Sequence, residues 1–158
     1  MVVISFAAFE DGLVDGVPVW PMIYYCLRCG DVKAAILAAN KSGPGLSEVA
    51  QLLTEICSSG DGRLSAHTEN VVRISYRRSI RSTTDPFKRA VYCILAACDP
   101  ADEHSEVATS LDDYLWIKLT QVRKHFAKLF LIDDLVVIHS ETQTLDICVP
   151  DQGRRSRA

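Results

Sequence analysis

The sequence predicts an all-α fold, an irregular α-solenoid or stack of antiparallel helical hairpins. Apolar residues recur every three or four positions in successive segments, which is the spacing of amphipathic helices. Clusters of glycine, proline and serine separate these segments by short loops, so consecutive helices are expected to lie side by side and antiparallel. The sequence has no tetratricopeptide, ankyrin or leucine-rich consensus, and the stack is therefore expected to be irregular.

The segment 14–31 predicts a tight helical hairpin. A helix rich in aromatic and aliphatic residues begins near Pro18 and ends at Gly30. Proline is tolerated in the first turn because the N–H groups there have no helical partner. Gly30 can take the left-handed conformation that ends a helix, and Asp31 can cap a short second helix that runs to about Asn40.

Two further helices follow the breaks at 41–45 and 58–62. The third helix has an apolar row at helical spacing: Leu46, Val49, Ala50, Leu53 and Ile56. The fourth helix, capped by Ser65, is expected to run to about Ser82. Its apolar row is Val72, Tyr76 and Ile80. Its polar row is Glu69, Arg73, Arg77 and Arg81, in which Glu69 can pair with Arg73.

A fifth and a sixth helix complete the expected stack. Asp85 and Pro86 form a cap followed by a first-turn proline, and the fifth helix is expected to extend through Cys98. Ser110 and Asp113 resemble a capping box at the start of the sixth helix. One side of that helix carries an apolar row: Leu111, Leu115, Leu119 and Val122.

The chain is expected to form one domain with less regular ends. The 158 residues suit a single domain or a piece of a larger one, and 48% of them are apolar. We expect a poorly defined segment over 1–11, the helical stack over 12–126, and a divergent, partly disordered tail over 127–158. The stretch 129–139 fits either a short helix or a small hairpin. Neither a signal peptide nor a membrane-spanning segment is expected.

The cysteines and histidines do not form a recognisable catalytic or metal motif. Cys26 and Cys29 have zinc or redox spacing, but the usual second pair is absent, so these cysteines are expected to pack in the core. The six cysteines are expected to be reduced and mostly buried. The histidines are isolated, and the glycine-rich segment 58–62 lacks the features of a phosphate loop. We therefore expect no enzyme, cofactor, metal or small-molecule substrate.

Charge is segregated along the chain. Residues 63–89 contain seven basic side chains and two acidic ones, whereas residues 99–113 contain six acidic side chains and no basic ones. A basic helix of this kind can bind RNA or DNA, but only Tyr76 is available there for stacking. The interpretation we favour is that the basic helix faces the acidic segment or a neighbouring protein. The candidate partner-contact surface is Arg73, Arg77 and Arg81.

Three collinear segments resemble one known family. They are VDGVPVWPMIYYCLRCGD, RLSAHTENVVRISYRRSIRSTTDPFKRAVYCILAACD and SEVATSLDDYLWIKLTQV. Over about residues 12–122 the chain is similar to the nucleoporin interacting component family, the scaffold nucleoporins of the inner ring of the nuclear pore. After about Val122 no counterpart is expected.

The resemblance implies a structural role. It implies a fragment of an α-solenoid at the nuclear envelope, in contact with other inner-ring scaffold nucleoporins, that supports pore assembly and the transport of protein and mRNA. It implies no catalytic residues. The alternatives are a helical-repeat adaptor, which would expose Trp20, Tyr24 and Trp116, and a nucleic-acid-binding domain. A stack that ends within such a solenoid leaves an apolar face uncovered, because each layer rests on the next.

Overall fold

The computed structural model describes residues 10–132, with side chains described for residues 10–122. In this part of the chain the fold is helical apart from one small β-hairpin, which confirms the predicted all-α class. The elements are β1 (Leu13–Val14), β2 (Val17–Pro18), α1 (Val19–Arg28), α2 (Val32–Lys41), η2 (Pro44–Leu46), α3 (Ser47–Ser58), α4 (Ala66–Arg78), η3 (Ile80–Ser82), α5 (Pro86–Ala96) and α6 (Leu111–Ile132).

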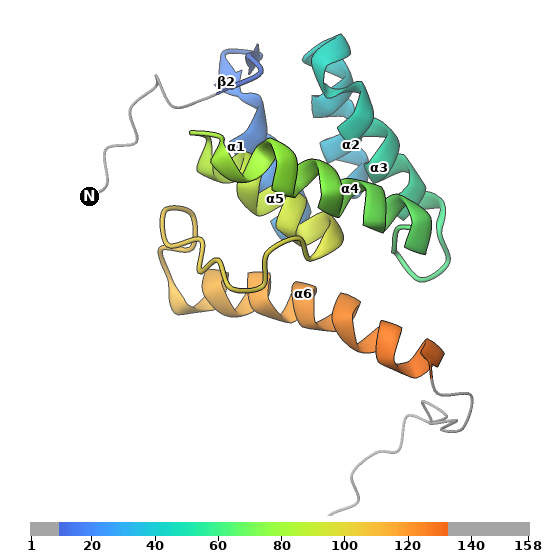
Figure 1. The fold of residues 1–158 in the computed structure, drawn as a ribbon. Helices are drawn as coiled ribbons and strands as arrows, with labels where there is room; N and C mark the ends of the chain where they lie inside the picture. The colour runs from blue at the N-terminus through green and yellow to red at the C-terminus, as the bar shows by residue number, and fades with distance from the viewer. Residues whose placement is uncertain (1–9, 133–158) are drawn as a thin grey trace, which may run out of the picture.

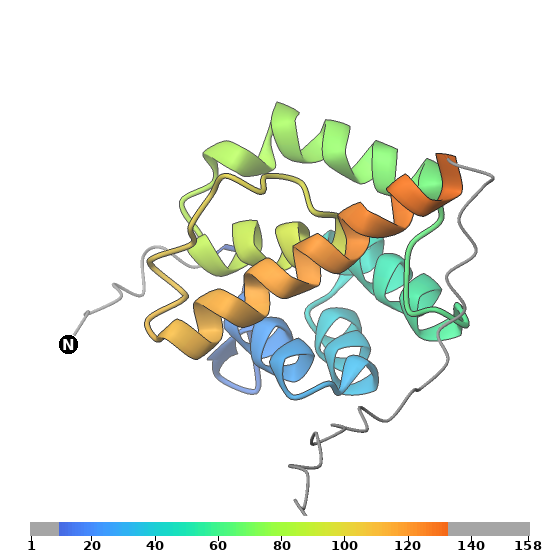
Figure 2. The same cartoon turned by 90° about the horizontal axis from the view of Figure 1, so that it is seen from below.

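Helix α5 lies at the centre of the stack. It packs against α1, α4 and α6, while α2 packs between α1 and α3. Figure 1 shows α4 in front of α5 and α6 below it, and the view from below in Figure 2 shows α6 running across the molecule and α4 along one edge. The described helices therefore form a layered stack in which α4 and α6 lie on the outside.

The first hairpin has the geometry that the sequence predicts. Gly30 has φ of +80°, and its N–H donates to the Leu27 carbonyl at 3.0 Å. The Asp31 N–H donates to the Cys26 carbonyl at 2.9 Å, which completes a Schellman motif at the end of α1. The Asp31 carboxylate then accepts the Ala34 N–H at 2.9 Å and caps α2.

A two-stranded hairpin precedes α1, where no strand was expected. Val14 pairs with Val17, and the two turn residues Asp15 and Gly16 have φ of +53° and +81°. Positive φ at both central residues is typical of the two-residue turn that Asp-Gly favours. The side chain of Lys88 contacts Asp11 at 2.7 Å and Glu10 at 3.0 Å, so the hairpin is held against the start of α5.

Two predicted helix ends are wrong by a few residues. Helix α4 ends at Arg78, because Ser79 leaves the helical conformation with φ of −138° and the chain continues as η3. Ile80 is nevertheless buried with Val72 and Tyr76, which confirms the apolar row. Helix α5 ends at Ala96 instead of Cys98, because Ala97 takes a left-handed conformation with φ of +48°.

The start of α6 is as predicted, but its apolar row is not covered in the described part of the chain. The Ser110 hydroxyl accepts the Asp113 N–H at 3.2 Å, as in a capping box. Among the α6 side chains described, up to residue 122, Ile117 and Gln121 are buried, and the predicted row is exposed: Leu111, Leu115, Leu119 and Val122. An apolar row of this kind is normally buried, so this side of α6 marks an uncovered face.

The expected domain boundaries remain predictions. Helix α6 runs through Ile132 and so crosses the boundary expected at residue 126. Residues 1–9 and 133–158 lie outside the described part of the chain. Of the stretch 129–139, residues 129–132 belong to α6, and the remainder lies outside the described residues, as does most of the predicted tail.

Asp85 and Asp31 provide a matched test of capping. Asp85 is fully buried, and its carboxylate accepts three backbone N–H groups, from Glu10 at 3.1 Å, Phe87 at 3.0 Å and Lys88 at 3.2 Å. Asp31 is exposed, and its carboxylate caps α2 by accepting one backbone N–H group. Asp31→Ala should cost about 1 kcal/mol of unfolding free energy, as an ordinary cap does. Asp85→Ala should cost about 2–4 kcal/mol, because it leaves buried donors unsatisfied. Urea unfolding measures both values, and equal losses would contradict this interpretation.

Candidate partner-binding surfaces

Arg73, the first member of the predicted arginine surface, is turned toward the protein. Its Nη2 lies 2.6 Å from Glu69 Oε1, which confirms the predicted ion pair, and its Nε donates to the Ala96 carbonyl at 2.7 Å. The Arg73 side chain is 19% exposed. Arg73 therefore joins α4 to the end of α5 and offers little surface to a partner.

The other two predicted arginines are exposed. The Arg77 Nε donates to the Arg73 carbonyl at 3.3 Å, and the Arg81 Nε lies 3.4 Å from Asp99 Oδ2. Arg89 pairs with Glu106 in the same way. These two ion pairs join the basic segment to the acidic one, as the favoured interpretation of the charge pattern expects.

A row of exposed apolar side chains lies on α6. Leu111 is 71% exposed and Leu119 is 64% exposed, and Leu115 and Val122 are exposed on the same side. Burial of a leucine side chain stabilises a protein by roughly 1.5–3 kcal/mol, so a row of such residues in water favours association with another apolar surface. We call these four residues the α6 row.

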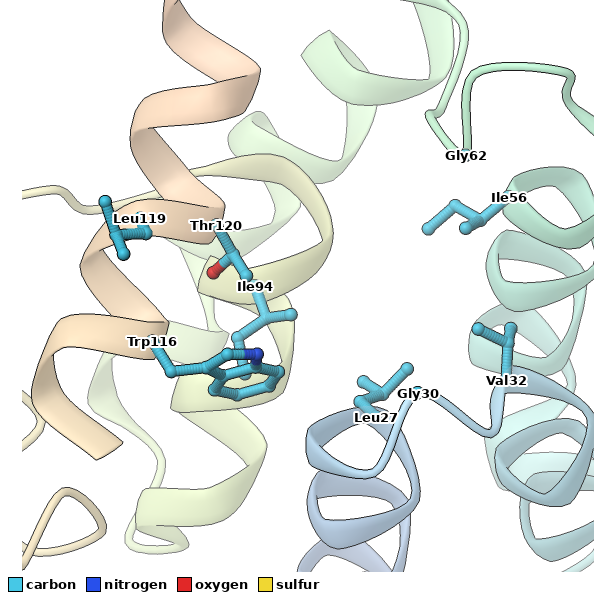
Figure 3. A pocket seen from close by; sticks show the side chains of 9 residues that line it. All are labelled: Leu27, Gly30, Val32, Ile56, Gly62, Ile94, Trp116, Leu119 and Thr120. Carbon is cyan, nitrogen blue, oxygen red and sulfur yellow. The ribbon is translucent and has the colours of Figure 1, made fainter. Parts of the chain in front are cut away.

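An apolar groove adjoins the α6 row. Figure 3 shows Trp116 and Thr120 of α6 and Ile94 of α5 on one side of the groove, facing Leu27 and Ile56 on the other. The groove has a volume of about 410 Å³. Its lining is completed by Gly30, Val32, Gly62 and Leu119.

Arg28, at the end of α1, contacts the part of α6 that forms one wall of the groove. Arg28 Nε lies 3.1 Å from Asp113 Oδ1, and the Arg28 guanidinium lies 5.1 Å from the centre of the Trp116 ring. Hydrogen bonds from Ser110 and Arg28 lower the pKa of Asp113 below its usual range. A charged contact therefore joins the end of α1 to α6 beside the groove.

The connection between α5 and α6 is anchored around a buried histidine. His104 is 4% exposed, has φ of +51°, and its Nδ1 lies 3.4 Å from Asp102 Oδ2. Lys118 Nζ donates to the carbonyls of Pro100 at 2.7 Å and Asp102 at 2.8 Å. These contacts set the position of α6 along α5, which the sequence did not reveal.

The cysteines differ from the expectation of burial. Among the five in the described residues, Cys93 is buried, Cys26 and Cys98 are half-buried, and Cys29 and Cys57 are exposed. Cys29 is exposed because it ends α1. Residues 10–122 contain no group of three or more histidine, cysteine or acidic side chains placed to hold a metal ion.

Two of the three aromatic residues named for an adaptor groove are buried. Trp20 and Tyr24 are each 1% exposed, and Trp116 is half-buried, with its ring 5.8 Å from that of Tyr24. None of the described helices is both long and apolar enough to cross a bilayer.

Comparison with known proteins identifies one family. The Nup93/Nic96 family model matches residues 7–146 of the chain. The match extends past Val122, so the expectation that the resemblance ends there is wrong.

The curated relatives agree with this match. The chain is 50% identical over 113 residues to the nuclear pore complex protein Nup93 of Xenopus laevis, which covers 72% of this chain and 14% of that protein. It is 39% identical over 110 residues to Nup93-1 of Drosophila melanogaster, covering 70% of this chain and 13% of that protein. It is 29% identical over 123 residues to the nucleoporin NIC96 of Saccharomyces cerevisiae, covering 73% of this chain and 15% of that protein. The chain thus spans about one seventh of their length.

The buried His104 predicts a pH-dependent stability. Burial lowers the pKa of His104 below its usual 6.5, so the folded state favours the neutral ring and proton binding favours the unfolded state. Stability should be unaffected by this group above about pH 6.5 and should fall as the pH drops below it. His104→Asn keeps a residue that tolerates positive φ and removes the titration. Urea unfolding at about pH 7.5 and 5.5 should show a smaller decrease in the variant, and identical decreases would contradict the assignment.

Proposed function

The chain belongs to the Nup93/Nic96 family, and on this basis we propose that it is a structural component of the nuclear pore scaffold. Its place would be the nuclear envelope, in the inner ring of the pore. There it would support pore assembly and so the passage of protein and mRNA. Its partners would be other inner-ring scaffold nucleoporins.

The observation that best supports this role is the combination of family membership with an uncovered helical face. Half of the aligned positions are identical to a vertebrate Nup93, and the described residues form stacked hairpins with the α6 row exposed. In stacked helical proteins each layer covers the apolar face of its neighbour. We infer that an adjoining scaffold layer covers the α6 row and fills the groove beside it.

The proposed role requires no catalysis. A scaffold acts through the apolar area that it buries and the geometry that it imposes on its neighbours, so no nucleophile, cofactor or substrate pocket is assigned. The groove is lined by leucine, isoleucine, valine and tryptophan side chains, which suit a protein helix better than a polar metabolite.

The two alternative functions are less well supported. A peptide adaptor that uses Trp20 and Tyr24 would need both rings at the surface, and both are buried. A nucleic-acid interface built on the arginine row would need several free guanidinium groups near an exposed aromatic ring. Arg73 is bound to Glu69, and Tyr76 is fully buried.

The arginine row remains a candidate contact surface within this proposal. Arg77 and Arg81 are exposed and can meet a partner's carboxylates. Arg73 lies on the inner flank of the same helix and fixes its position against α5.

Localisation and co-purification test the proposed function. The tagged chain should give a nuclear-rim signal that coincides with pore markers, and it should co-purify with inner-ring scaffold nucleoporins. Leu115→Glu combined with Leu119→Glu should abolish both results, because the charges would lie in the covered face. A diffuse cytosolic signal for the unchanged chain would contradict the proposal.

Leu37→Glu is the matched control. Leu37 is 62% exposed on α2 and belongs neither to the α6 row nor to the lining of the groove, so the same apolar-to-acidic change there should leave the rim signal intact. Circular dichroism of the purified chains would check that the variants remain helical.

A further inference from the structure

Helix α4 has a second face that the stack does not cover. Val72 and Tyr76 are buried on its inner side, whereas Val71 is 47% exposed and Ile74 is 52% exposed on its outer side. Figures 1 and 2 both show α4 at the edge of the described molecule, with no other element against this outer side. Val71 and Ile74 are one turn apart, so they form one small apolar site on the helix surface.

Basic side chains border this apolar site. Arg77 and Arg78 are exposed in the last turn of α4, and Arg81 follows in η3. No ion pair is formed by Arg77 or Arg78 among residues 10–122, and Glu69, the acidic residue of α4, lies on the inner side with Arg73. The outer face of α4 therefore combines two exposed apolar side chains with a local positive charge, in a chain whose net charge is −3.

Helix stability explains only part of this arrangement. Arginines in a last turn interact favourably with the negative end of the helix dipole, by roughly 0.3–1 kcal/mol each. The helix dipole does not explain why Val71 and Ile74 are exposed, because these apolar side chains lie earlier in the helix and their exposure to water does not stabilise it. The apolar pair and the arginines together have the composition of a protein-binding surface, with an apolar centre and a charged rim.

We propose that the outer face of α4 binds an acidic amphipathic helix of a partner protein. Apolar side chains of that helix pack on Val71 and Ile74, and its carboxylates accept paired hydrogen bonds from Arg77 and Arg78. The face from His67 to Arg78 spans roughly 18 Å at 1.5 Å per residue, which accommodates about three turns of a partner helix. Nucleic acid fits less well, because the face has no exposed phenylalanine, tyrosine or tryptophan ring for a base to stack on.

This inference goes beyond the scaffold role and has a different surface from the α6 row. It is tested on the 158-residue chain itself, so it can fail while the nuclear-rim localisation succeeds, and the reverse also holds. The probes are two synthetic helical peptides with the same leucine positions, one flanked by glutamates and the other by lysines, together with a single-stranded RNA.

Fluorescence anisotropy measures the affinity of each labelled probe for the dilute chain. The glutamate peptide should bind at least about tenfold more tightly than the lysine peptide, because like charges repel at the rim. Ile74→Asp should weaken its binding about tenfold, and so should Arg77→Glu combined with Arg78→Glu. All of these positions are exposed, and thermal melting followed by circular dichroism would verify that each variant folds.

Matched changes on another helix provide the controls. Leu37→Asp and Lys33→Glu, both at exposed positions of α2, should leave the affinity for the glutamate peptide unchanged. The proposal is overturned if the two peptides bind equally or not at all, or if the α2 variants weaken binding as much as the α4 variants. It is also overturned if the RNA binds more tightly than the glutamate peptide and loses its affinity with the arginine changes.

Discussion

The burial on all sides of residues 90–96 of α5 is the constraint on which the rest of the structure depends. Every residue from Ala90 to Ala96 is at most 6% exposed, and the helix begins at the fully buried carboxylate of Asp85. A helix without a polar side is stable in water only when other elements surround it. Helices α1, α4 and α6 do so from different directions, and each uses one face for this purpose. Loss of any one of them would expose part of α5 to water.

This central helix also determines which surfaces are free. Because α4 and α6 each use one face to cover α5, their opposite faces lie on the outside of the stack (Figure 2). The α6 row is wholly apolar, whereas the outer face of α4 has an apolar centre and a basic edge. Under the two proposals above, an apolar layer of the scaffold covers the α6 row and an acidic helix binds the outer face of α4. A scaffold protein can hold two neighbours at once through such a division.

Local sequence signals predicted the helices well and the exposed surfaces poorly. Caps such as Asp31 and Asp85 act within a few residues, so their effect can be inferred from the sequence, and helical spacing identified the rows on α3 and α4. Spacing cannot tell which side of a helix meets the core. On α6 the spacing identified an apolar row, but that row is exposed, whereas Ile117 and the polar Gln121 are buried. The inward turn of Arg73 and the position of His104 depend on contacts between segments distant in sequence, which local patterns do not contain.

Thiol labelling in assembled pores tests the central claim most directly, namely that the exposed side of α6 is covered by a scaffold neighbour. Leu115→Cys and, as control, Leu37→Cys would be introduced into a chain in which the exposed Cys29 and Cys57 are replaced by serine. A maleimide reagent should label both introduced thiols in the dilute free chain. In isolated nuclear envelopes the thiol at position 115 should be protected and the one at position 37 should still react. Equal labelling of both in the envelopes would contradict the account.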